Sequence, residues 1–176
     1  RVNIVNNIVT YNKCYGTSKG SGGGISVGYW GTGDVSKMGA KIINNTIRHN
    51  YAQHKGNAIY VKSMDVEILN NIIRDNDQNL NAQIHLESAG FSKKIEYCNI
   101  QDGYEGTGNI DLDPVFCDHD YCLLTQTYSP CIDAGNPDPI YNDNTTQIGD
   151  SALYPAYGTA RNDMGAFGGP HSRWHE

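Results

Sequence analysis

Four segments of the chain align with one another without gaps, and this repeat constrains the fold more than any other feature. The segments begin at Val2, Ala40, Val66 and Lys93, and their starting points lie 38, 26 and 27 residues apart. Internal similarity at a spacing in the twenties is typical of solenoids, in which each coil buries its apolar residues only against neighbouring coils. The repeat therefore predicts a stack of coils.

The matched positions carry β-branched residues in short runs, which favours strands over helices. One column consists of Ile4, Ile42, Ile68 and Ile95, and a second consists of Val9, Ile47, Ile73 and Ile100. Parallel strands stack about 4.8 Å apart. Each column is therefore expected to form a continuous apolar row inside a β-coil.

A third column is polar and consists of Asn7, Asn45, Asn71 and Cys98. Asparagine tolerates the left-handed backbone of a tight corner, and stacked asparagines can also pass hydrogen bonds from coil to coil. We predict an asparagine ladder that is continued by Cys98 as a buried free thiol. The alternative is that asparagine occurs here simply as a common turn residue. A similar column repeats at the next corner with Asn12, Asn50, Asn76 and Gly103.

A second strand is predicted in every coil, at residues 24–27, 58–61, 83–86 and 109–112. Alternation along these strands points the isoleucines inward and two other columns outward. The first outward column consists of Ser26, Tyr60, His85 and Asp111, and the next consists of Gly28, Lys62, Glu87 and Asp113. On the first strand of each coil, Asn3, Lys41, Glu67 and Lys94 are expected to stack outward as solvated structure.

The length of 176 residues suits one all-β domain. Residues 1–112 are expected to hold about four coils, with a loop insertion at 28–39. Residues 113–176 are rich in Asp, Pro, Gly and Tyr and are expected to form an irregular C-terminal cap on the last coil. The net charge of −6 argues against nucleic acid as a partner. No apolar run is long enough to span a membrane.

The five cysteines give no thiolate zinc pattern, because no C-x-x-C pair occurs. Cys117, Cys122 and Cys131 cluster near the C-terminus, where an extracellular protein would carry a disulfide. The first strand starts at Arg1 with no capping element before it. Because an open solenoid end exposes unpaired strands, self-association through this N-terminal coil is expected, and a processed or fragmentary chain is the alternative.

The C-terminal third contains two specific motifs, S-P-C-I-D-A-G at residues 129–135 and D-M-G-A-F-G-G-P at 163–170. With these motifs and the coil repeat, the chain resembles secreted right-handed parallel β-helix proteins of the pectate-lyase-like superfamily. The closest resemblance is to the C-terminal part of choice-of-anchor Q surface proteins. The resemblance implies a three-faced right-handed coil, export from the cell and frequent links to polysaccharide. It implies no single reaction, because members include lyases, hydrolases and proteins of no known activity.

The outward columns contain the candidate catalytic residues, which are Lys62, His85, Glu87 and Asp111. A polysaccharide lyase needs a base such as Lys62 or His85, and Glu87 with Asp113 could share a cation. Paired carboxylates for glycoside hydrolysis are also available in Glu87 and Asp111. The alternative interpretation, which we prefer, is that these are ordinary outward residues of a solenoid.

Two further groups are candidates for binding. Tyr29 and Trp30 in the loop insertion, together with Tyr60, could stack on sugars, or the pair could pack as a lid on the solenoid. Asp113, Asp133 and Asp163 could hold calcium as an optional staple, and no cofactor is required. For Asp133 and Asp163 the alternative is that they accept backbone N–H bonds in turns.

These observations favour an extracellular or cell-surface, non-catalytic β-solenoid module that forms surface structure or filaments and contacts glycans. The alternative is a fragment of a polysaccharide lyase or glycoside hydrolase that acts on an acidic polysaccharide.

Overall fold

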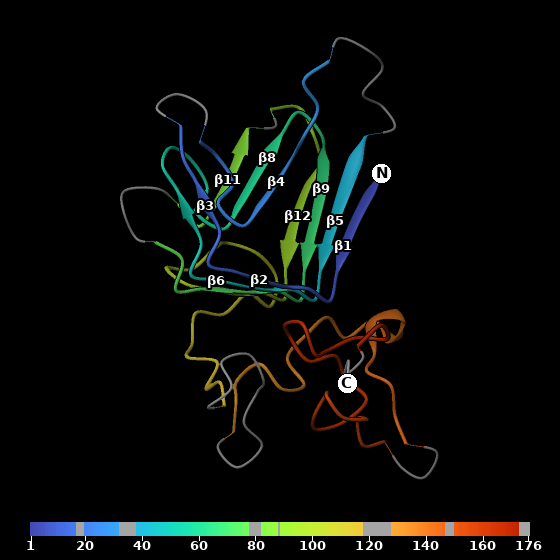
Figure 1. Ribbon diagram of the computed structural model, residues 1–176. Coiled ribbons are helices and arrows are strands. Elements are labelled where there is room, and N and C mark those ends of the chain that lie inside the picture. The colour runs from blue at the N-terminus through green and yellow to red at the C-terminus, as the bar shows by residue number, and fades with distance from the viewer. Residues whose placement is uncertain are drawn as a thin grey trace.

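The computed structural model describes residues 1–16, 20–31, 38–77, 82–87, 89–117, 128–146 and 150–172. It is an all-β parallel solenoid with an irregular C-terminal segment (Figure 1). The strands are β1 (Val2–Val5), β2 (Ile8–Thr10), β3 (Lys13–Cys14), β4 (Ile25–Gly28), β5 (Gly39–Ile43), β6 (Thr46–Arg48), β7 (Tyr51–Ala52), β8 (Ile59–Lys62), β9 (Asp65–Leu69), β10 (Ile72–Arg74), β11 (Ile84–Glu87), β12 (Lys93–Glu96) and β13 (Asn99–Ile100). One 3-10 turn, η1 (Pro139–Tyr141), follows them.

The strands form three main faces around an apolar interior. Their orders are β1-β5-β9-β12, β13-β10-β6-β2 and β11-β8-β4, and a short separate pair β3-β7 follows the second face after a corner at Tyr11 and His49. Every pairing between these strands is parallel. Such a stack satisfies the backbone groups of each inner strand with those of the coils on either side.

The register confirms both predicted apolar columns. Ile42 pairs with Ile4 and Ile68, and Ile68 pairs with Ile95. In the second column, Ile73 pairs with Ile47 and Ile100. Ile42, Ile47, Ile68 and Ile73 are completely buried. These rows therefore form the core that the repeat predicted.

The asparagine ladder is present, but the left-handed corner lies one residue earlier than the sequence argument placed it. The residues with positive φ are Asn6, Asn44, Asn70 and Tyr97, at 55°, 51°, 55° and 51°. Each directly precedes a ladder residue. The left-handed residue turns the chain, which leaves the next side chain free to point inward and bond along the stack.

Cys98 occupies the fourth rung of the ladder as predicted, and Asn109 continues it, because Asn109 Oδ1 accepts the Cys98 N–H at 2.9 Å and Asn109 Nδ2 donates to Ile95 O at 3.0 Å. Cys98 is a free, fully buried thiol, and its Sγ lies 3.4 Å from the backbone nitrogen of Asn71. Burial raises the pKa of this thiol to about 12. Cys117 is disulfide-bonded, whereas Cys131 is a buried free thiol and so lies outside any disulfide.

The predicted fourth strand at residues 109–112 does not join the β11-β8-β4 face. Ile110 forms a parallel bridge with Asn99 instead, and it bonds the backbone of Cys98 and Ile100 at 2.9 Å each. Gly103, Gly106 and Gly108 have positive φ and turn the chain back beside β13 before it reaches the third face. Leu112, expected to point inward, is 52 % exposed.

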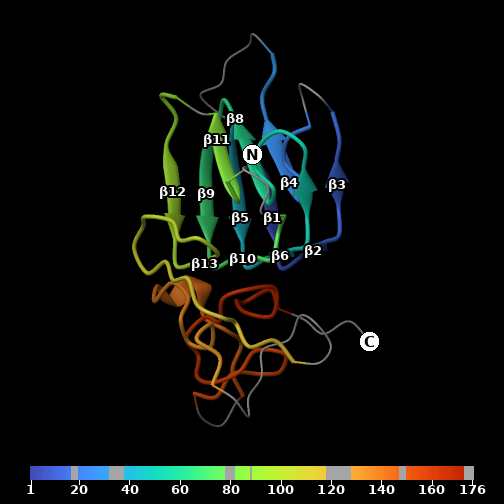
Figure 2. The ribbon, with the colours of Figure 1, turned by 90° about the vertical axis from the view of Figure 1, so that its left-hand side faces the viewer.

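The C-terminal segment packs along the side of the solenoid. Figures 1 and 2 show it beneath the β13-β10-β6-β2 face, on the side away from the interior. Asn6, Asn44 and Asn70, from three successive coils, all bond backbone of this segment. Ile72 packs there with Cys131, Ile132 and Met164. The segment therefore contacts several coils, whereas the sequence argument placed it on the last one.

Candidate functional site

Four of the predicted site residues come together on the outer face of β4, β8 and β11. Tyr60 pairs in register with His85, and Lys62 pairs with Glu87. Alternation places these side chains outside, because Ile59, Val61 and Ile84 point into the core. We call this surface, with Trp30 and Lys55, the β8 face.

Glu87 is the hub of the β8 face. Its carboxylate accepts hydrogen bonds from the Tyr60 hydroxyl at 2.8 Å, from Lys62 Nζ at 3.1 Å and from Lys55 Nζ at 3.2 Å. These donors, Tyr60 first, lower the pKa of Glu87 to about 2. Glu87 is therefore ionised and fully engaged at neutral pH.

The rings of Tyr60 and His85 stack on neighbouring strands, with centroids 5.9 Å apart and an interplanar angle of 14°. Burial, reinforced by the bond to Glu87, raises the pKa of Tyr60 to about 12. Burial and then the charge of Lys55 lower the pKa of His85. At neutral pH the face therefore carries two lysine cations, one carboxylate and a neutral histidine.

Trp30 extends the β8 face by one coil. Gly28 occupies the outward position beside Lys62, and a Cβ built there would lie 2.9 Å from the Trp30 ring. The indole therefore lies over Gly28, in the row that continues with Lys62 and Glu87. It remains 66 % exposed. Its predicted partner Tyr29 has its hydroxyl beside Gly31, and it is only partly exposed.

Asp111 and Asp113 do not join this group, contrary to the prediction. The turn at 103–108 places residue 110 beside β13, so Asp111 bonds Arg74 at 2.5 Å. Asp113 accepts the backbone N–H of Val115 at 2.9 Å. Of the carboxylates predicted for the patch, only Glu87 lies on it. The paired acids that glycoside hydrolysis requires are not assembled from these residues.

The aspartates proposed as calcium ligands bond to backbone and side-chain donors. Asp133 accepts the backbone N–H and hydroxyl of Thr159, and Asp163 accepts the N–H groups of Asp133 and Tyr157. Among the described residues, no group of three or more His, Cys, Asp or Glu is placed to hold a metal ion. The backbone-bonding alternative thus describes the positions of Asp133 and Asp163, and calcium binding itself stays a prediction.

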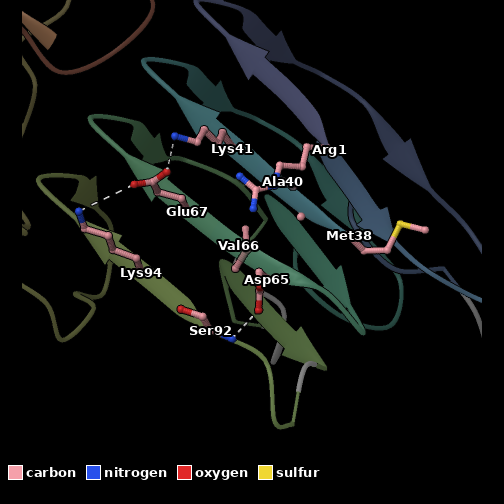
Figure 3. A pocket seen from close by; sticks show the side chains of 10 residues that line it. Arg1, Met38, Ala40, Lys41, Asp65, Val66, Glu67, Ser92 and Lys94 are labelled. Atoms are coloured by element: carbon pink, nitrogen blue, oxygen red, sulfur yellow. Dashed lines mark hydrogen bonds and ion pairs between the residues drawn. The ribbon is translucent and has the colours of Figure 1, made fainter. Parts of the chain in front are cut away.

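A second candidate surface is a groove of about 210 Å³ on the outer face of β5 and β9 (Figure 3). Glu67 lies between Lys41 and Lys94, at 2.9 and 3.8 Å from their Nζ atoms, as the sequence predicted. Arg1, which precedes β1, and Met38, which precedes β5, line the other end of the groove. Both lysines share one carboxylate, so this arrangement is a mixed-charge ladder that stabilises adjacent strands.

The sequence did not predict that Lys55 belongs to the β8 face, or that the Trp30 indole lies over Gly28. Lys55 lies between β7 and β8, in a connection that varies between coils, so the repeat alignment does not place it. A usable signal for Trp30 was present at Gly28. Glycine in an outward strand column, where the other coils carry Lys62 and Glu87, indicates close approach by another group.

No helix in the part of the chain that the structure describes has the length and hydrophobicity to cross a membrane. No family model, curated protein or solved structure matches the chain.

Proposed function

We propose that this chain is a non-catalytic, extracellular β-solenoid module that binds an acidic glycan on its β8 face. The observation that carries the proposal is the placement of Trp30, two-thirds exposed and in line with Lys62 on a parallel sheet. A flat indole stacks on the apolar face of a sugar ring, and a nearby lysine pairs with a sugar carboxylate.

The charges on the face set the expected ligand class. Lys55 and Lys62 share the single carboxylate of Glu87, and His85 is held neutral, so the local charge is positive in a chain of net charge −6. A uronate-containing polysaccharide complements this face better than a neutral one. Extracellular placement is supported by the disulfide at Cys117 and by the resemblance to choice-of-anchor Q proteins of the pectate-lyase-like superfamily.

A binding role fits the state of Glu87 better than a catalytic one. A general acid must hold a proton near neutral pH, whereas the pKa of Glu87 is lowered to about 2. Lys62 Nζ, another predicted catalytic group, donates to the Glu87 carboxylate at 3.1 Å and is held in this ion pair.

Binding to polygalacturonate and alginate, measured by affinity electrophoresis and calorimetry, tests the proposal. Trp30→Ala is expected to weaken binding by about tenfold, from the loss of roughly 1.4 kcal/mol of stacking. Tyr128→Ala is the matched control, because Tyr128 is an aromatic residue of the C-terminal segment that is 78 % exposed. Absence of binding to any acidic glycan, or equal affinity of Trp30→Ala and the parent chain, would reject the proposal.

Lys62→Ala is expected to weaken binding and to reduce its salt dependence, because one ion pair with the glycan is lost. Repeating the measurements with a calcium chelator tests the calcium prediction separately. The affinity of the β8 face is expected to persist without the ion.

One observation favours polysaccharide lyase activity as a second candidate. His85 is held neutral beside a lysine and a tyrosine, which are groups that proton abstraction next to a carboxyl can use. An elimination reaction leaves an unsaturated uronate that absorbs ultraviolet light. Turnover that disappears in both His85→Ala and Glu87→Gln would replace the binding proposal, whereas a pure binding face keeps or gains affinity in Glu87→Gln.

A further inference from the structure

Three strand edges without a strand partner among the described residues lie at the same end of the solenoid. β1, β2 and β4 are each the outermost strand of their sheet, and all three belong to the first coil. We call these three edges the first-coil edge. Their sequences, VNIV, IVT and ISVG, contain no charged residue and no proline, whereas the short fourth strand of this coil, β3, contains Lys13. Each facing strand, β5, β6 and β8, contains a lysine or an arginine.

An uncharged edge is unusual for a surface that meets only water. Exposed edges are normally blocked by charged side chains, prolines or covering segments, because their free N–H and C=O groups recruit further strands. Here the edge also exposes apolar side chains, with Val2 47 % and Ile8 41 % accessible. The first-coil edge therefore lacks the features that normally block pairing with a further strand.

The asparagine ladders show which partner would fit. In each rung the side-chain oxygen accepts two bonds from the preceding coil, one from a backbone N–H and one from an asparagine amide. Asn45 receives both from Asn7, and Asn50 receives both from Asn12. The side-chain oxygens of Asn7 and Asn12 receive no such bonds from the described residues. The side-chain oxygens of Asn7 and Asn12 are therefore the last acceptors of the two ladders at this edge. By analogy with Asn45 and Asn50, each is placed to accept one bond from a backbone N–H and one from an asparagine amide of a further coil.

The opposite end of the solenoid does not offer these donors. Residues 107–110 cross it, with Tyr97 N–H bonded to Thr107 O at 2.8 Å and Ile110 bonded to Cys98 and Ile100. β11 and β12 are also outermost strands at this end, but the residue aligned with the second ladder corner there is Gly103, so a second copy of this chain does not match both ladder acceptors. We infer that the first-coil edge is a docking surface for a parallel β-coil of another β-solenoid segment with asparagine at both ladder corners. This inference does not depend on the proposed glycan binding.

A coil supplied by fusion tests this directly. Arg1 precedes Val2 as Asp65 precedes Val66, so a copy of residues 40–64 placed before Arg1 continues the register. The fused coil is expected to slow hydrogen exchange at β1 and β2 amides by at least about tenfold and to raise the melting temperature.

Two controls separate docking from a general effect of added chain. In the first, the copies of Asn45 and Asn50 in the added coil are replaced by alanine, which removes the amide donors to Asn7 and Asn12. In the second, the added coil is a glycine–serine linker of equal length. Docking is expected to be strongest in the fusion with both asparagines and absent with the linker.

Equal protection in all three fusions would overturn the inference. So would unfused chain that forms dimers in light scattering with its β1 and β2 amides already protected, because a second copy would then occupy the edge.

Discussion

Asn45 accepts two hydrogen bonds from Asn7, one from the backbone N–H at 3.0 Å and one from the side-chain amide at 3.1 Å. Asn71 accepts the same pair from Asn45, at 2.9 and 3.0 Å. Each rung thus satisfies the corner N–H of the coil before it from inside the stack. The ladder is a direct link between the repeat in the sequence and the stability of the fold.

Asn45→Ala is expected to destabilise the chain by roughly 3 kcal/mol, because it removes the partner of part-buried backbone groups at Asn7, Ile4 and Ile43 and one bond to the buried oxygen of Asn71. Chemical denaturation measures this change. Asn7→Ala, at the exposed end of the ladder, should cost under about 1.5 kcal/mol. Similar losses in the two variants would contradict a cooperative ladder.

The three free thiols of the described residues are expected to react in a fixed order. Burial raises the pKa of Cys98 to about 12 and that of Cys131 to about 11, whereas Cys14 is only half-buried. A thiol reagent at about pH 8 should modify Cys14 first and reach the other two only on unfolding, because the thiolate is the reactive form. Mass spectrometry after timed labelling checks this order. A Cys14→Ser chain should show no fast modification, and native labelling of Cys98 at the rate of Cys14 would refute the expectation.

Stability is expected to fall as the pH rises from about 5 to 8. Burial and the charge of Asp163 raise the pKa of Asp143 to about 8, and burial raises that of Asp163 to about 7, from an ordinary 3.8. The folded chain therefore holds protons that the unfolded chain releases. The stabilisation is complete below about pH 4 and is lost as the pH passes about 8.

Calorimetry should show this loss as a decrease of at least about 1 kcal/mol, or roughly 2–4 °C in melting temperature. Asp143→Asn should flatten the slope. Glu87 does not contribute to it, because its pKa is lowered to about 2 and it is ionised throughout. A melting temperature that rises between pH 5 and 8 would show that other groups dominate.

Gly28→Ala is expected to displace the Trp30 indole, because the new Cβ would lie 2.9 Å from the ring and 3.0 Å from Lys62. Glycan affinity should fall about tenfold, as for Trp30→Ala. Fluorescence quenching, in a background with Trp174→Phe, reports the moved indole. Ser26→Ala on the same strand is the control and should leave both readouts unchanged.

The coils could be predicted from the sequence because side chains at equal positions in successive coils contact one another. Ile42 and Ile68 are paired in the register that the alignment gave. The fate of residues 109–112 could not be predicted the same way. Their pattern matches a strand, but three glycines upstream redirect the chain, and Ile110 gains backbone bonds beside β13 instead.

The candidate site was predicted where the repeat fixes it and missed where a connection supplies it. Tyr60, Lys62, His85 and Glu87 occupy matched strand positions, so alternation alone placed them together. Lys55 comes from a turn, and Asp111 follows the redirected segment, so neither position follows from the period. Tertiary contacts decide such positions.

The C-terminal segment stabilises the solenoid by bonding several of its coils along one side. A solenoid held only by contacts between adjacent coils can fray one coil at a time from its ends. Asn6, Asn44 and Asn70 tie the first three coils to the same irregular segment. The first coil cannot separate without breaking its bonds to this segment, so we expect the first three coils and the segment to unfold together.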